Sequence, residues 1–463
     1  MVDSKFQYMG EWWIPDKPTQ RVSGLLKFDY YKGAILDLIG SLRDEKESDQ
    51  IFQPEIILGS SNGKAITLHE CFEIKHRASM SSPSWEIAYR KSTFLASTVY
   101  VGAHFENKDS IKFRKLLVHY SNLDEWVWLR WLDIDFPDSG EVVIKCKKPE
   151  SIEAIISEGC KVSIDIQLTY PTFSMVQKEA SIKQRAYIRI EFEQDTPFND
   201  FLQIVHRIAH FLSLGVTEPI YPLHVIGMRP LPTEAAEEGQ NQQEVEIFML
   251  LGKRKGTKTV LPFDMFFTLR DIQNNFEVLL HTWFEKADKL QPVYDLYFAA
   301  LYNPSMYIHH AFLSFVQAVE AYHRRDESMI HYAIPQKDYD RITKKLIDAI
   351  QDEPKEYKLL LENKFSILNQ PLLSKRIMDI RNKFSDMLGE ALDDKSIYAI
   401  ARTRTTLTHQ DETIDKKGAK GEQLYDLTLK LKLLIEVCLL AELGFNPGEI
   451  KKAISKVRWL RKG

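Results

Sequence analysis

The chain has 463 residues, of which 44% are hydrophobic and 27% charged, and its formal net charge is −4. This length exceeds one ordinary domain, so we expect two or three hydrophobic cores. The small net charge gives no reason to expect nucleic acid to bind over the whole surface, and a basic surface must be local.

The N-terminus lacks the basic start and apolar stretch of a secretory signal, and charged residues interrupt the most apolar stretch, Leu429 to Leu443. A membrane-spanning helix needs about 20 mostly apolar residues. The four cysteines, Cys71, Cys146, Cys160 and Cys438, have neither metal-ligand nor disulfide-framework spacing. We therefore expect a cytoplasmic protein with free thiols and no contact with a membrane.

Residues 23–192 are predicted to form many short strands separated by Gly, Pro, Asn and Asp. Alternation such as Val162, Ile164, Ile166, Leu168 has a period of two, so one face of each strand is buried. Many strands at about ten-residue spacing indicate a sandwich or barrel-like domain. The predicted strands are GLLKFDYY, AILDLIGSL, PEIILGSS, KAITLHECFEI, TFLASTVYVGAHF, KFRKLLVHYS, EWVWLRWL, EVVIKCK, KVSIDIQLTY and AYIRIEFE.

A predicted helix, Phe201 to Leu214, ends at Gly215, and the strand-like segments YPLHVIGM and EVEIFMLL follow with an acidic loop between them. Beyond about Pro262 the patterns are helical. The sequence therefore predicts an α+β protein in three parts. These are a β-rich, sandwich-like domain over residues 1–260, a helical connector over 261–304, and an all-α bundle over 305–463.

Two helical patterns mark the bundle. Phe312, Phe315, Val316 and Val319 recur at i, i+3, i+4 and i+7, which is one buried stripe. The late helix, Leu424 to Leu443, is apolar nearly all round and suits the centre of a bundle.

The segment IARTRTTLTHQDE contains Arg402, Arg404 and His409. Cleavage of RNA without a metal ion requires the ribose 2′-hydroxyl to attack the adjacent phosphorus. Histidine is suited to the proton transfer, and a guanidinium can bind two charged phosphoryl oxygens in the transition state. An arginine and a histidine are thus sufficient for the chemistry of a ribonuclease. The same two residue types also occur at this spacing by chance, on helix faces that only contact solvent.

Helix geometry distinguishes the two arginines. On a regular helix, Arg402 and His409 differ in direction by only about 20°, whereas Arg404 and His409 differ by about 140°. Three β-branched threonines, at 405, 406 and 408, also allow a loop that leads into a helix. Either arginine could serve a histidine of a second subunit, so the choice stays open.

The C-terminal third resembles a HEPN domain, whose hallmark is an arginine, four to six residues, and a histidine. The matching segments are HHAFLSFVQAVEAYHRR (309–325) and IARTRTTLTHQDE (400–412). The segments GEWWIPDKPTQRVSGLLKFDYYKGAILDLIGSL (10–42) and TLRDIQNNFEVLLHTWFE (268–285) resemble the ApeA-type anti-phage HEPN proteins. The resemblance implies a metal-independent endoribonuclease that damages RNA to abort phage infection, with the β-rich domain sensing or regulating.

Carried over by position, Arg404 and His409 match the arginine and histidine of the family, and Arg402 is a further catalytic candidate. Thr405 stands where many HEPN members have Asn, Asp or His, and Glu320 is a candidate to orient an arginine from across the bundle.

The resemblance also implies a homodimer or larger even-numbered homo-oligomer, and an activator supplied by the phage. Lys416, Lys417 and Lys420 follow the motif and are candidates to bind RNA phosphates.

His206 and His210 have the spacing of a helical metal pair, but Arg207 stands where the zinc-protease pattern has glutamate, so no metal or cofactor is expected. Two alternatives remain open. One is a catalytically silent HEPN scaffold with a ligand- or protein-binding β domain, which Thr405 favours. The other is a β-sandwich that binds a ligand through tryptophans, with helices that only oligomerise.

Overall fold

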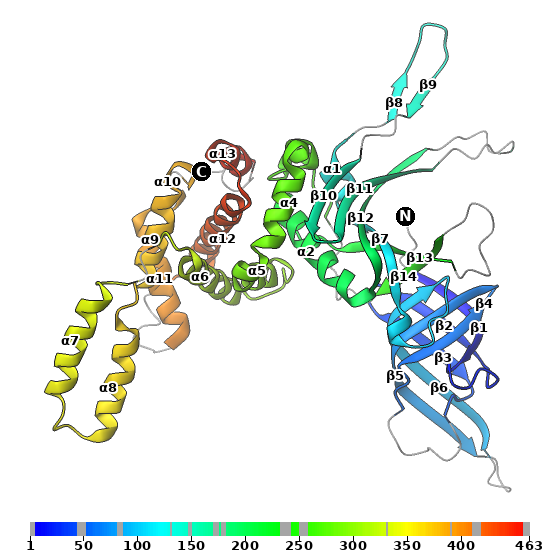
Figure 1. Cartoon of the computed structure of the whole chain (residues 1–463), viewed down its shortest axis with the longest axis horizontal. Coiled ribbons are helices and arrows are strands. Elements are labelled where there is room, and N and C mark those ends of the chain that lie inside the picture. Colours follow the sequence, from blue (N-terminus) through cyan, green and yellow to red (C-terminus); the bar gives the residue numbers. More distant parts are fainter. Residues whose placement is uncertain are drawn as a thin grey trace. The chain divides into compact units, whose positions relative to one another are not determined.

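The computed structural model describes residues 5–43, 52–80, 87–129, 132–146, 151–169, 176, 182–231, 242–249, 258–329, 332–388, 391–409 and 418–456. The chain forms two compact units, Met1–His281 and Thr282–Gly463. The first is rich in strands and the second is helical, which confirms the predicted α+β class (Figure 1). The predicted connector, residues 261–304, is divided between the two units.

Twelve of the described strands of the first unit form one sheet in the order β10-β11-β12-β7-β13-β14-β6-β3-β2-β1-β4-β5, and β8 and β9 form a separate hairpin. The strands are β1 (Lys5–Trp13), β2 (Val22–Asp29), β3 (Gly33–Ile39), β4 (Ile56–Ser61), β5 (Lys64–Met80), β6 (Ile87–Val101), β7 (Lys112–Tyr120), β8 (Leu132–Asp135), β9 (Val143–Cys146), β10 (Ile152–Ser157), β11 (Cys160–Thr169), β12 (Lys183–Pro197), β13 (Pro222–Pro230) and β14 (Gln242–Met249).

One half of this sheet closes on itself. Strand β5 pairs with both β4 and β6, so that β6, β3, β2, β1, β4 and β5 form a barrel. Its interior is filled by buried apolar side chains such as Trp12, Leu26 and Phe94. The ring of Trp12 lies over Gly59, where a Cβ atom would come within 2.3 Å of it, so this contact requires glycine. Among the described strands, β10 lies at the far end of the order, at an edge of the sheet.

The other half of the sheet, from β14 to β10, is covered on one face by α2 (Phe198–Val216). The prediction that Gly215 ends this helix was wrong, because the helix ends at Val216 and is capped by Thr217 with a φ of 67°. A Cβ atom on Gly215 would lie 3.0 Å from the rings of Phe267 and Trp126. Glycine therefore serves close packing here rather than termination.

The predicted strand EWVWLRWL was also wrong, because residues Leu123–Val127 form the short helix α1. Trp126 is buried and its ring lies 6.2 Å from that of Phe211 in α2. Packing of this aromatic residue outweighs the strand preference of its neighbours. Trp12 and Trp13 are buried as well, Trp128 is exposed, and Trp131 lies outside the described residues.

The described helices of the remaining chain begin with α3 (Leu269–Ile272) and α4 (Phe276–Glu285). Those of the second unit are α5 (Ala287–Leu301), α6 (Ile308–Arg325), α7 (Gln336–Ala349), α8 (Lys355–Leu368), α9 (Leu373–Lys383), α10 (Ser385–Leu388), α11 (Asp394–His409), α12 (Gly421–Leu443) and α13 (Pro447–Ser455). Short 3₁₀ turns lie at Lys108–Ser110, Pro262–Asp264 and Gln273–Asn275.

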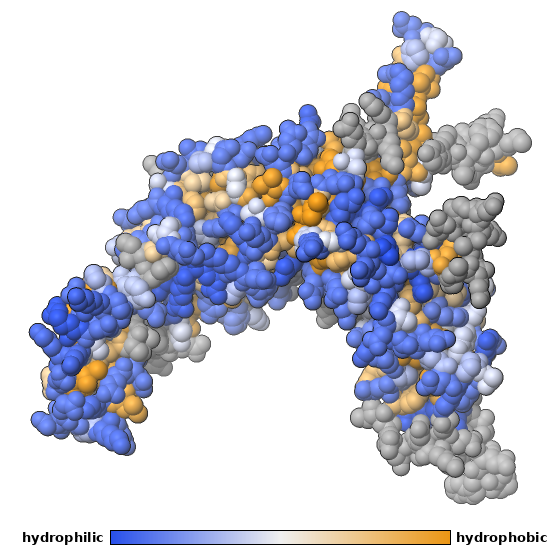
Figure 2. Space-filling view, in the orientation of Figure 1, coloured by the Kyte–Doolittle hydropathy of each residue, from blue (hydrophilic) through white to orange (hydrophobic). Residues whose placement is uncertain are grey.

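Helix α12 lies at the centre of the helical unit, as predicted, with buried residues on nearly every side. The hydroxyls of Tyr297 in α5 and Tyr322 in α6 donate to Glu436 and Glu442 of α12, at 2.7 and 3.0 Å. These bonds fix the three helices against one another. Helices α7 and α8 project from the bundle, and Figure 2 shows apolar surface on them, where Leu346, Leu359 and Leu360 are exposed.

Candidate functional site

The arginines and the histidine of the predicted motif lie on one continuous helix, α11. Its first turn is capped by Asp393, whose carboxylate accepts the N–H of Ser396 at 2.9 Å. Hydrogen bonds from Ser396 hold the pKa of Asp393 below its usual range. Ile397, Ile400 and Thr403 form the buried stripe that packs α11 into the bundle.

The helix continues through the β-branched residues of the motif, so the alternative of a loop leading into a helix was wrong. The hydroxyls of Thr405 and Thr406 donate to the carbonyls of Ala401 and Arg402, four residues back, both at 3.1 Å. Thr408 bonds to Arg404 in the same way. Back-bonding occupies these hydroxyls within the helix. Thr405 therefore does not donate its hydroxyl hydrogen to a substrate in this arrangement.

Arg402 is exposed and Arg404 is half-buried. Because α11 is regular as far as His409, position 409 lies about 20° in direction from Arg402 and about 140° from Arg404. The side chain of His409 and residues 410–417, with Lys416 and Lys417, lie outside the described part of the chain.

Beyond the motif the chain returns to the buried side of α11. The N–H of Ala419 donates to the hydroxyl of Thr403 at 3.0 Å, and Gly418 lies against Thr406, where a Cβ atom would come within 2.9 Å. Lys420 follows Ala419 directly and is exposed. Its backbone therefore lies close to the turn of α11 that carries Arg402 and Arg404.

Glu320, on α6, is half-buried, and its charge affects the pKa of Arg376 in α9. Burial, together with the charge of Arg324, lowers the pKa of Arg376, and the carboxylate of Glu320 acts in the opposite direction. The role of Glu320 in orienting an arginine of the motif stays a prediction, and the one arginine whose pKa its charge affects, Arg376, lies outside the motif.

Arg376 belongs to a buried cluster that the sequence analysis missed. Its Nη1 lies 3.2 Å from Nδ1 of His323, and Nε2 of His323 lies 3.3 Å from Asp379. His323 has no exposed surface, so this second arginine–histidine pair cannot touch RNA. The sequence did indicate that His323 is buried, because position 323 extends the buried stripe through Val316 and Val319 by one more turn.

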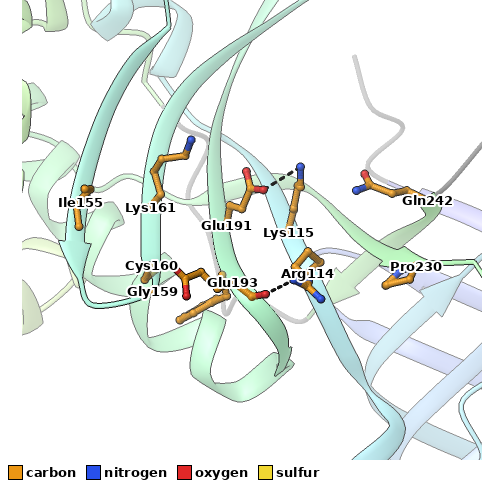
Figure 3. Close-up of a pocket in the computed structure, with 11 residues that line it drawn as sticks. Arg114, Lys115, Ile155, Gly159, Cys160, Lys161, Glu191, Glu193, Pro230 and Gln242 are labelled. Carbon is orange, nitrogen blue, oxygen red and sulfur yellow. Dashed lines mark hydrogen bonds and ion pairs between the residues drawn. The ribbon is translucent and has the colours of Figure 1, made fainter.

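A cavity of about 600 Å³ lies in the first unit, across β10, β11, β12 and β7 (Figure 3). Its bases are paired with acids: Lys115 lies 3.0 Å from Glu191, and Arg114 lies 3.0 Å from Asp195. Lys161 pairs with Glu153, at 3.1 Å. Paired charges of this kind leave little net attraction for a phosphate.

In the part of the chain that the structure describes, no helix is long and apolar enough to cross a membrane. Within the same residues, no group of three or more His, Cys, Asp or Glu side chains is arranged to hold a metal ion.

Residues 313–449 match the Apea-like HEPN domain, so the helical unit that contains α11 is of the HEPN class. Residues 7–283 match ApeA N-terminal domain 1. The chain therefore belongs to the ApeA-type HEPN family, a family of anti-phage nucleases. No curated protein and no solved structure matches the chain significantly.

Proposed function

We propose that the chain is a metal-independent endoribonuclease that acts in anti-phage defence, with His409, Arg404 and Arg402 as its catalytic residues. The observation that supports this most is the regular course of α11, with Arg402 exposed on the face of position 409 and the backbone of Lys420 close by. Arg404 is included because it matches the arginine of the HEPN motif. The N-terminal unit then has a sensing or regulatory role.

In this mechanism His409 transfers a proton at the 2′-hydroxyl or at the leaving oxygen, and the arginines stabilise charge on the phosphoryl oxygens. Lys420, with Lys416 and Lys417, binds neighbouring phosphates, which makes RNA affinity dependent on salt. A single imidazole serves as base and acid only in sequence. That sequence needs one histidine per site, and a homodimer or a larger even-numbered assembly brings an arginine of a second motif to the same phosphate.

The test is cleavage of end-labelled RNA in excess EDTA by the wild-type chain and by His409→Ala. We expect wild-type cleavage that leaves 2′,3′-cyclic phosphate ends, and no cleavage by the folded variant. Strict dependence on magnesium or manganese would contradict the mechanism, and normal cleavage by His409→Ala would contradict the site.

A catalytically silent HEPN scaffold is the second candidate, and the hydrogen bond from Thr405 to Ala401 favours it. Thr405 stands where many HEPN proteins have an amide, carboxylate or imidazole next to the arginine. In this second candidate the β-rich unit binds a protein or another ligand, and the same experiment leaves the RNA uncleaved under every condition.

A further inference from the structure

Strands β5 and β6 continue beyond the other strands of the barrel as a two-stranded ribbon (Figure 1). Strand β4 pairs with β5 only as far as His69, and β3 pairs with β6 only as far as Lys91. From Phe72 to Arg77, β5 therefore has β6 as its one neighbour among the described strands. The two faces of this ribbon differ in what they contact.

The register decides which side chains share a face of the ribbon. Three residues of β5 each lie directly opposite a residue of β6, in the pairs Phe72 with Leu95, Lys75 with Thr93, and Arg77 with Lys91. Between these positions on β6, Ser92 and Phe94 are fully buried on the side of the barrel interior. Because side chains of a strand alternate between its two faces, the three pairs lie together on the outer face.

The outer face carries three exposed cations, Lys75, Arg77 and Lys91. Arg77 and Lys91 are directly opposite each other, and like charges in this position destabilise a sheet. Lysine commonly protects an edge strand from pairing with another chain. This accounts for the cations of β5 but not for Lys91, because β6 lies between β5 and β3 at that point.

Acids of the neighbouring positions do not neutralise these cations. Glu73 points to the other face, where its carboxylate accepts from Nε of Arg43 at 2.7 Å. Asp37, on β3, is paired with Lys27 at 3.3 Å and accepts from Thr93 at 2.9 Å. Among the described residues, no carboxylate forms an ion pair with a cation of the outer face. The outer face is therefore a local basic surface on a chain whose net charge is −4.

Phe72 adds an aromatic ring to this basic row, and it is 43% exposed. Proteins that bind single-stranded nucleic acid combine cations, which contact phosphates, with aromatic rings, on which bases stack. The guanidinium of Arg77 can bind two oxygens of one phosphate. The major groove of an RNA double helix is deep and narrow, so a ribbon of two strands suits a single strand of RNA better than a duplex.

We propose that the outer face of the β5–β6 ribbon binds single-stranded RNA. Lys75, Arg77 and Lys91 contact neighbouring phosphates, and Phe72 stacks on a base. The choice of RNA as the ligand rests on the proposed function, whereas the site itself lies in the first unit and contains no residue of the motif on α11.

The test measures binding of the full-length chain to a fluorescein-labelled strand of 2′-O-methyl uridines, about 12 nucleotides long, by anisotropy. This strand has no free 2′-hydroxyl, so the proposed mechanism cannot cleave it. We expect the triple variant Lys75→Gln, Arg77→Gln, Lys91→Gln to bind at least tenfold more weakly at low salt. Its plot of log affinity against log salt should be shallower by about 2, because each phosphate contact on a single strand contributes about 0.7.

The matched control is the triple variant Arg114→Gln, Lys115→Gln, Lys161→Gln. It changes the net charge by the same amount but removes cations that are already paired with acids. We expect its affinity to stay within about twofold of the wild type. Both variants keep the acid-rich segment 44–49, which lies outside the described residues, so its repulsion of RNA is common to both. An equal loss of binding in the two variants would overturn the proposal.

Two further measurements separate loss of the site from loss of the fold. Removing the opposed charges of Arg77 and Lys91 relieves repulsion, so the first triple variant should melt at or above the wild-type temperature. Phe72→Ala should weaken binding, and Phe72→Trp should preserve it, because stacking requires an aromatic face. Unchanged binding by Phe72→Ala would contradict the stacking role.

Cleavage of unmodified RNA is measured separately, so that the two proposals can fail independently. Binding through the ribbon without any cleavage would contradict the proposed function alone. Cleavage by the wild type, with equal binding of the modified strand by the wild type and the first triple variant, would overturn the ribbon site alone. So would loss of binding to vesicles of phosphatidylcholine and phosphatidylserine in that variant with RNA affinity unchanged, because the ligand would then be a membrane.

Discussion

Nη1 of Arg376 lies 3.2 Å from Nδ1 of His323, and both side chains are almost fully buried in the helical unit. A guanidinium has donors only, so Nδ1 of His323 must accept. The proton of the neutral ring is then on Nε2, which faces Asp379 at 3.3 Å. Arg376 also donates to the carbonyl of Pro371 at 3.0 Å. The neighbours of His323 thus fix both its tautomer and its orientation.

The first prediction concerns this buried histidine. His323→Ala removes the acceptor of a buried guanidinium, and loss of a hydrogen bond to a charged group costs about 1.5–3 kcal/mol. We expect faster hydrogen exchange of the amides of α6 and α9, measured by mass spectrometry on the full chain. His310→Ala, at an exposed position of α6, is the matched control and should change stability by less than about 0.5 kcal/mol. Equal exchange in the two variants would show that the cluster is unimportant for stability.

Much of the β-rich unit could be predicted from the sequence because strand alternation is local. Val162 and Ile164 are buried, as the period of two predicts, but Ser163 between them is buried as well, and Ile166 and Leu168 are only half-buried. Closure of the barrel could not be predicted, because it depends on pairing between β5 and β6, which no local pattern specifies. The strand predicted around Trp126 and the helix end predicted at Gly215 were wrong for a related reason. Each residue packs against a neighbour that is distant in the sequence.

For the candidate site, the residues and their directions on a regular helix could be predicted from the sequence. Whether the segment forms a helix or a loop could not. That depended on the burial of Ile397, Ile400 and Thr403 against the bundle, which overcame the weak helix preference of the threonines. The influence of Glu320 on Arg376 could not be predicted for the same reason, because Arg376 lies on α9 and only the folded chain brings the two charges near each other.

The second prediction concerns the thiols. Burial raises the pKa of Cys160 to about 12, and it raises the pKa values of Cys71 and Cys438 still further. A raised thiol pKa keeps the unreactive protonated form across the neutral range. Cys146 is exposed.

We therefore expect one equivalent of thiol to react with Ellman's reagent in the native chain at pH 8, and four after denaturation. Raising the pH to 9 should not release the other three, because the pKa of each lies well above that value. Cys146→Ser is the control and should abolish the native reaction. Rapid reaction of two or more thiols in the native chain would contradict the burial.

The third prediction separates charge from shape at Arg404. Lysine keeps the positive charge but cannot bind two phosphoryl oxygens through a planar fork. We expect Arg404→Lys to lower kcat for RNA cleavage by on the order of 100-fold, the cost of one lost transition-state donor, with little change in RNA affinity. Arg341→Lys, on the exposed α7, is the matched control and should keep full activity. A loss of affinity with unchanged kcat would instead assign Arg404 to RNA binding.

The last prediction decides how the two arginines are shared between subunits. Arg402 lies on the same face of α11 as position 409, so we expect it to act with the histidine of its own chain. Arg404 points about 140° away on the same helix and is better placed to serve the histidine of a partner across a two-fold axis. Light scattering should first show a dimer or a larger even-numbered assembly.

Mixing inactive variants after subunit exchange then tests the arrangement. In a mixed dimer of His409→Ala with Arg404→Ala, one of the two composite sites keeps both groups, so a random mixture should recover about a quarter of wild-type cleavage. A mixture of His409→Ala with Arg402→Ala should stay inactive, because no chain then holds both groups. Rescue in the second mixture and not the first would reverse the assignment. A monomeric active enzyme, with no rescue in either mixture, would place the whole site within one chain.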